Sequence, residues 1–242
     1  MDQTATFALF AQGKEAWNAW AEAVTAEQCA LVASGKWRFS VEQQYPGDVI
    51  PENPETRAWM SDSIAKFTQA EFADPVDFSG FVFPGKALFM NCKFRGAARF
   101  SGAKFRYGAI FNVASFAGPA DFENVKFCSE GEFMRVDFAG PACFRGARFT
   151  RGDVEPSMTG WGWFESARFA EAATFSSADF GFTAAFSDAQ FMKDADFDGC
   201  AFRGLAWFSR TRFDGAARFA AAAFAHQPEL AEASFAQPAI WG

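Results

Sequence analysis

Few residues in this chain of 242 could support catalysis. The single histidine, His226, lies two residues before Pro228, and we interpret it as a surface or turn residue rather than a general base. The five cysteines show no spacing typical of a metal site or a disulfide framework. Unpatterned thiols and the lack of a recognisable signal peptide predict a reducing, cytoplasmic setting. We therefore expect no catalytic residue, no cofactor, no metal site and no enzyme activity.

One acidic stretch has the opening spacing of a calcium-binding loop. Asp194, Asp196 and Asp198 alternate as the oxygen ligands of an EF-hand do. The twelfth position of such a loop needs a bidentate glutamate, and here it is Leu205. Phe197 also falls on the repeat described next, so we interpret the carboxylates as residues that flank an inward Phe.

The spacing of the Phe residues predicts the structural elements that hold these residues in place. The chain has 34 Phe against 2 Tyr, and one series of Phe from Phe67 to Phe149 recurs at spacings that alternate between 5 and 6. The series resumes at Phe164 and runs to Phe224. Neither spacing fits one face of a helix or of a strand, so each Phe must begin a new short segment after a bend. Small residues such as Ala98, two positions before a Phe, are expected to point inward as well.

The interval between near-identical segments gives the number of sides. FAGPADF at 116–122 returns as FAGPACF at 138–144, which is 22 residues later. If short and long sides alternate, equal sides stack only when the number of sides is even. A coil with two sides would repeat after half of this interval, and a coil with four sides would repeat after the whole interval. The sequence therefore predicts a four-sided β-helix in which each Phe stacks on the next at the strand spacing of about 4.8 Å.

Segments such as FRGAARFSGAKF (94–105) resemble the pentapeptide-repeat proteins, in a Phe-centred variant with alternating 5- and 6-residue steps. The resemblance extends over about residues 67–241. It implies an all-β solenoid, a right-handed quadrilateral β-helix with about 22 residues per coil. GKEAWNAW (13–20) is similar to the helical leader that often precedes such repeats.

Two domains are expected: a helical and mixed capping region at 1–66 and the β-helix at 67–242. Within 1–35, Trp17, Trp20 and Val24 share a helix face, Thr25 opens a segment with the form of a capping box, and two short helices are predicted. Asn53-Pro54 has the form of a further helix start. A solenoid needs its open end covered, so we interpret 1–66 as the cap.

The step from Phe149 to Phe164 is much longer than the repeat expects, which predicts an inserted loop at 150–163. In some pentapeptide-repeat proteins that protect DNA topoisomerases, such loops contact the enzyme. The resemblance thus makes Arg151, Asp153, Trp161 and Trp163 candidate recognition residues. A tolerated surface insertion is the alternative.

The residue before each Phe should face solvent, and one of the four resulting columns is far more apolar than the others. It includes Leu88, Ile110, Trp163 and Trp207, and segments of the same side carry Tyr107, Phe182 and Leu205. We expect such a strip to be covered rather than bare in water. The N-terminal helices, the inserted loop or a second molecule, including a second copy in a homodimer, are the covers considered.

Charge separates the functional hypotheses. Residues 78–242 carry 17 acidic and 17 basic residues, whereas a DNA mimic needs a strongly negative surface and a nucleic-acid binder needs a basic one. We therefore expect a rod-like, non-enzymatic interaction or scaffold protein with an unknown protein partner, and no direct binding to nucleic acid or membrane. The alternative, which the resemblance to pentapeptide-repeat proteins implies, is a DNA gyrase-directed inhibitor or protector that acts by DNA mimicry.

Overall fold

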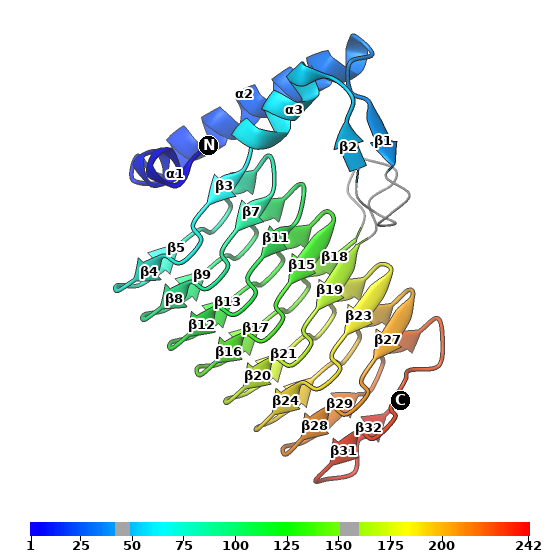
Figure 1. The fold of residues 1–242 in the computed structure, drawn as a ribbon. Helices are drawn as coiled ribbons and strands as arrows, with labels where there is room; N and C mark the ends of the chain where they lie inside the picture. The colour runs from blue at the N-terminus through cyan, green and yellow to red at the C-terminus, as the bar shows by residue number, and fades with distance from the viewer. Residues whose placement is uncertain (42–48, 151–159) are drawn as a thin grey trace.

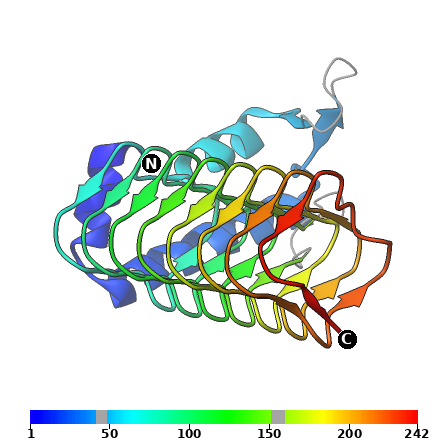
Figure 2. The same ribbon diagram turned by 90° about the horizontal axis from the view of Figure 1, so that it is seen from below.

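The computed structural model describes residues 1–41, 49–150 and 160–242. Within these residues, short parallel strands stack into four sheets that form the sides of a solenoid, and the N-terminal helices lie at its β3 end (Figures 1 and 2). Phe105 pairs with Phe127 of the next coil, at the same interval that separates FAGPADF from FAGPACF, which confirms the predicted four-sided coil. We call the sides faces 1 to 4 in chain order.

Each face is one ladder of parallel strands. Face 1 contains β3 (Ala65–Lys66), β7 (Ala87–Leu88), β11 (Ala109–Ile110), β15 (Glu130–Glu132), β19 (Trp161–Trp163), β23 (Thr183–Ala185) and β27 (Leu205–Trp207). Face 2 contains β4 (Glu71–Phe72), β8 (Lys93–Phe94), β12 (Ser115–Phe116), β16 (Asp137–Phe138), β20 (Arg168–Phe169), β24 (Gln190–Phe191), β28 (Arg212–Phe213) and β31 (Ser234–Phe235).

Face 3 contains β5 (Val76–Asp77), β9 (Ala98–Arg99), β13 (Ala120–Asp121), β17 (Ala142–Cys143), β21 (Ala173–Thr174), β25 (Ala195–Asp196), β29 (Ala217–Phe219) and β32 (Ile240–Trp241). Face 4 contains β6 (Val82–Phe83), β10 (Lys104–Phe105), β14 (Lys126–Phe127), β18 (Arg148–Phe149), β22 (Asp179–Phe180), β26 (Ala201–Phe202) and β30 (Ala223–Phe224).

Stacked phenylalanine rings fill the interior. Phe122 is fully buried, and its ring is parallel to those of Phe100 and Phe144, with centroids 4.8 Å away on each side. The backbone ladder sets this spacing, which lies within the range of favourable parallel ring pairs. Edge-to-face contacts between columns, such as Phe111 against Phe122 at 5.4 Å and 87°, supply a second favourable arrangement.

The corners explain why short and long steps alternate. At the corners between faces 1 and 2 and between faces 3 and 4, the second residue after the Phe has a left-handed backbone, as in Asn91 (φ 55°) and Asn124 (φ 55°). The next amide then bonds back to the Phe carbonyl, so these tight turns take the shorter step. The other two corners take the longer step. At one of them, a Cβ on Gly118 would lie 2.9 Å from the Gly96 carbonyl carbon, so the Gly of FAGPADF is required for stacking.

Three helices and one hairpin precede the solenoid in the described residues: α1 (Gln3–Phe10), α2 (Lys14–Ala33), β1 (Phe39–Val41) paired antiparallel with β2 (Val49–Pro51), and α3 (Pro54–Asp62). Asn53 caps α3, as predicted, and its side chain accepts a hydrogen bond from the Thr56 amide. The expected helix start at Thr25 is wrong. The Thr25 hydroxyl donates to the Ala21 carbonyl inside the 20-residue α2.

The helices satisfy the backbone groups that the first strands leave open. Thr6 of α1 accepts from the Lys66 amide of β3 at 3.1 Å. Asn18 of α2 accepts from the Val82 amide of β6 at 2.9 Å, and the Trp17 indole donates to the Val82 carbonyl at 2.9 Å. An open edge strand invites pairing with other chains, and these side chains cover that edge on faces 1 and 4.

Candidate interaction surface

The strand register brings the predicted apolar residues onto face 1. Leu88, Ile110, Trp163 and Trp207 occupy one outward column, and each is half-buried. The column ends in a bridge from Trp207 to Glu229. Arg151 and Asp153 lie outside the residues that the structure describes.

Trp161 and Trp163 belong to β19 rather than to the inserted loop in which the sequence placed them. They pair with Glu130 and Glu132 of β15, so the extra residues of the insertion precede Trp161. Both tryptophans point outward and Gly162 points inward, where a Cβ would lie 2.8 Å from the Phe180 ring. A run of Trp-Gly-Trp thus fits the alternation of a strand on this face.

The protein's own helices cover Tyr107, at the corner between faces 4 and 1. Tyr107 is 6% exposed and packs with Leu31 of α2 and Trp59 of α3, whose ring centroid lies 5.4 Å away. Gln28 of α2 donates a hydrogen bond to the Tyr107 hydroxyl. Since this residue is occupied within the chain, it is not part of the surface proposed below.

Further along face 1, five residues form what we call the apolar strip: Trp161, Trp163, Phe182, Leu205 and Trp207. The rings of Trp161 and Trp163 stack at 5.1 Å and 3°, and Phe182 stacks on Trp161 at 5.8 Å and 12°. Phe182 is 49% exposed and Leu205 is 42% exposed. The strip is therefore a contiguous apolar surface with a rigid strand backbone beneath it.

Ion pairs border the apolar strip. Arg203 pairs with Asp179 at 2.6 Å, and Arg210 pairs with Asp188 at 2.7 Å. These pairs hold the pKa of Arg203, and that of Arg210, above its ordinary value through the side-chain hydrogen bonds and the opposite charges. An apolar centre with a charged border is the usual anatomy of a protein interface.

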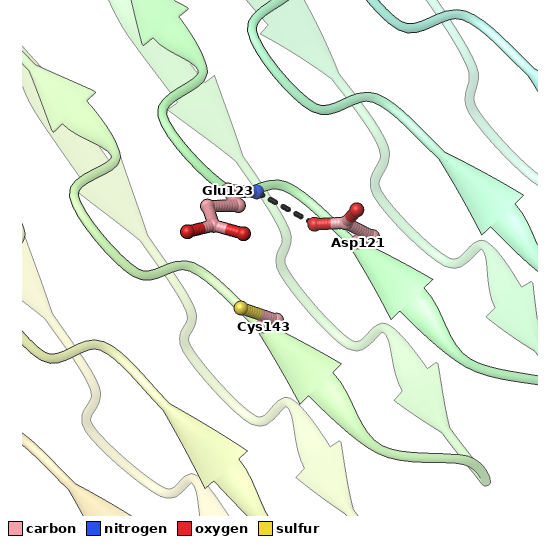
Figure 3. Close-up of side chains that lie close together, drawn as sticks. All are labelled: Asp121, Glu123 and Cys143. Atoms are coloured by element: carbon pink, nitrogen blue, oxygen red, sulfur yellow. Dashed lines mark hydrogen bonds between the residues drawn. The ribbon is translucent and has the colours of Figure 1, made fainter.

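Face 3 carries a cluster that the sequence did not predict. Asp121, Glu123 and Cys143 place one donor atom each within 4.8 Å of one another (Figure 3). The signal was available, because Glu123 follows Asp121 by two residues across the inward Phe122, and Cys143 stacks on Asp121 in the next coil. Asp121 already accepts a hydrogen bond from the Glu123 amide at 2.9 Å. Burial, and then the two carboxylates, raise the pKa of the Cys143 thiol, which opposes the thiolate that a metal needs.

The remaining candidate groups have structural partners. Asp196 accepts from the Asp198 amide at 2.9 Å and Asp194 from the Ala216 amide at 3.0 Å, so these oxygens bind the backbone of the coils. Cys92 and Cys200 point inward, as predicted. Burial raises the pKa of each thiol to about 12.

Comparisons with known proteins support the fold. A family model described as pentapeptide repeats (9 copies) matches residues 67–126. The strand register continues without a change of pattern from these coils to Trp241. No curated protein and no solved structure matches the chain. Among the described residues, the helices are too short or too polar to cross a membrane.

Proposed function

We propose that this chain, of which residues 67–126 match the pentapeptide-repeat model, is a rigid, non-enzymatic protein-interaction module that binds its partner through the apolar strip. The single observation that carries this proposal is the exposure of Phe182 and Leu205 beside three tryptophans on one face. Large apolar side chains gathered in one exposed patch are a common feature of interaction sites.

The solenoid supports the strip in a way that favours binding. The strands of the strip, β19 and β23, are each hydrogen-bonded to a strand on both sides. β27 is bonded to β23 on one side and to the Glu229 bridge on the other. The backbone is therefore already ordered, and association need not order it again. Tryptophan and other large rings also contribute most per residue at interface centres.

The chemistry of the described residues supports a non-enzymatic role. His226 is exposed, and the inward thiols of Cys92 and Cys200 have pKa values of about 12 and are therefore protonated at neutral pH. The balance of 17 acidic and 17 basic residues in 78–242 does not favour DNA mimicry, so we do not propose a gyrase-directed role.

The test is a paired substitution in the full chain. Phe182→Ser with Leu205→Ser removes the exposed part of the strip, while Met192→Ser changes another exposed apolar residue, 40% exposed, elsewhere on the solenoid. Cross-linking in the native cell, followed by light scattering on each purified protein, should show a protein complex or self-association for wild type and Met192→Ser that the double variant lacks. Identical complexes and masses for all three proteins would contradict the proposal.

A further inference from the structure

Equivalent positions recur at the corner between faces 4 and 1, once in each coil. Tyr107, Ser129, Gly160, Phe182 and Gly204 occupy the same place because the strands that follow them are in register. The Phe182 amide donates to the Gly160 carbonyl at 2.8 Å, and the Leu205 amide donates to the Phe182 carbonyl at 2.9 Å. Phe182 is thus the counterpart of Tyr107, three coils further along.

The two counterparts differ in what covers them. Tyr107 is 6% exposed beneath α2 and α3, while Phe182 is 49% exposed. Figure 1 shows the helices beside the first coils of the solenoid, with β23 and β27 further along it. The chain therefore contains one occupied and one open example of the same corner.

The occupied example shows which shape fits the corner. Val24, Gln28 and Leu31 of α2 reach the Tyr107 cluster, and these positions are i, i+4 and i+7 on one helix face. Thr25 of the same helix accepts a hydrogen bond from Arg106, the residue before Tyr107. Two apolar side chains of α2 therefore pack at this corner, Gln28 between them bonds to a hydroxyl that Phe182 lacks, and Trp59 of α3 completes the cover.

The small size of the apolar strip favours a narrow binding partner, such as a single helix, over a second copy of the chain. The strip extends over β19, β23 and β27, three strand positions at about 4.8 Å, or roughly 10 Å. A strip of that length and about 10 Å in width falls well below the ~800 Å² per partner of a standard interface, which disfavours a second copy packed on it face to face. A helix rises about 1.5 Å per residue and is about 10 Å wide, so about two turns, from i to i+7, cover the strip.

We infer that the apolar strip binds one amphipathic α-helix of a partner protein, with apolar side chains at i, i+4 and i+7 seated around Phe182 and Leu205. This inference rests on the proposed function and specifies the occupant. Arg203 and Arg210, with their paired aspartates, provide the polar border for the flanks of that helix. The occupant repeats in trans the contact that α2 makes in cis.

The experiment selects ligands for the immobilised full-length protein from two displayed libraries of short peptides, each long enough for about three to four helical turns. One library varies the residues of a side-chain-stapled helix, and the other has prolines that keep every member extended. The helix library should yield binders with apolar residues at i, i+4 and i+7. These binders should bind wild type and Met192→Ser equally and the Phe182→Ser, Leu205→Ser protein at least about tenfold more weakly.

The other outcomes separate the two proposals. Binders from the extended library alone, lost in the double variant, would overturn the helical occupant and leave the interaction surface standing. A wild-type dimer that the double variant converts to a monomer would do the same, with a second copy as the occupant. Selection that yields no binder from either library would count against both proposals. So would binders whose affinity is the same for wild type and for the double variant.

Discussion

Truncation of one ring in the middle of the stack tests how the solenoid is held together. Phe127 is fully buried, stacked between Phe105 at 5.1 Å and Phe149 at 4.8 Å, with Phe133 edge-on at 5.7 Å. Phe127→Ala removes all of these contacts. Large-to-small core substitutions of this kind cost about 3–5 kcal/mol, depending on how far the surroundings collapse.

The backbone places the expected cost in the upper half of that range. The Cys128 amide bonds to the Phe105 carbonyl at 2.9 Å, and the Thr150 amide bonds to the Phe127 carbonyl at 3.2 Å. These ladders fix the coils at the strand spacing, so the neighbouring rings cannot close the void without breaking them. We expect Phe127→Ala to lower the free energy of unfolding by about 4–5 kcal/mol.

The assay is equilibrium urea unfolding followed by circular dichroism and by tryptophan fluorescence, whose agreement checks for a single transition. The matched control is Phe235→Ala in the last coil, where the ring is partly exposed and stacks on Phe213 at 4.9 Å. That variant should lose only about 1–2 kcal/mol, since much less area is buried. Equal losses for the two variants, or a loss under about 1.5 kcal/mol for Phe127→Ala, would refute the reasoning that the ladder holds the void open.

Three further predictions concern single positions. Val113 has a left-handed backbone (φ 61°) at a corner where the preceding coil has Asn91, so Val113→Asn should stabilise the protein by about 1 kcal/mol in the same urea assay, and a loss of stability would argue against strain there. In the native protein a thiol reagent should label exposed Cys29 quickly and leave Cys92 unlabelled until unfolding, because burial raises the pKa of Cys92 to about 12; early labelling of Cys92 would show that the coils open readily. Burial also raises the pKa of Glu132, so the stability from its protonated form is present at acid pH and falls as pH rises through that pKa. Glu132→Gln should accordingly weaken the fall in thermal midpoint as pH rises above the ordinary pKa range of a glutamate, and an unchanged profile would exclude this carboxyl as a source of that fall.

The solenoid was predictable because its amino-acid sequence repeats at a regular interval. The alternating short and long steps between successive Phe determine which side chains point inward, and the recurrence of whole segments determines which coils stack. The register of Leu88, Ile110 and Trp163 on one face followed from counting alone. The insertion did not disturb it, since Glu132 pairs with Trp163 once the extra residues are set aside.

The contacts between the cap and the solenoid were not predictable in the same way. Gln28 and Tyr107 are 79 positions apart, and no repeat connects a helix residue to a corner of a distant coil. Thr25 shows the related difficulty for local motifs: a hydroxyl can cap a helix start or bond back to a carbonyl within a helix, and only the packing of α2 decides. The burial of Tyr107 depends on the continuous α2 helix and on its long-range packing against the solenoid.

Because every coil adds the same rise, the solenoid fixes the distance between two contacts along its length. Tyr107, beneath the helices, and its open counterpart Phe182 are three coils apart, so about 14 Å of solenoid separates the docked helices from the free corner. Addition or removal of one whole coil between them would change that separation by one strand spacing while every ring stack and ladder kept its partner type. The distance between an attached helix and a bound one could then be set in steps of about 4.8 Å, with no residue in either contact altered.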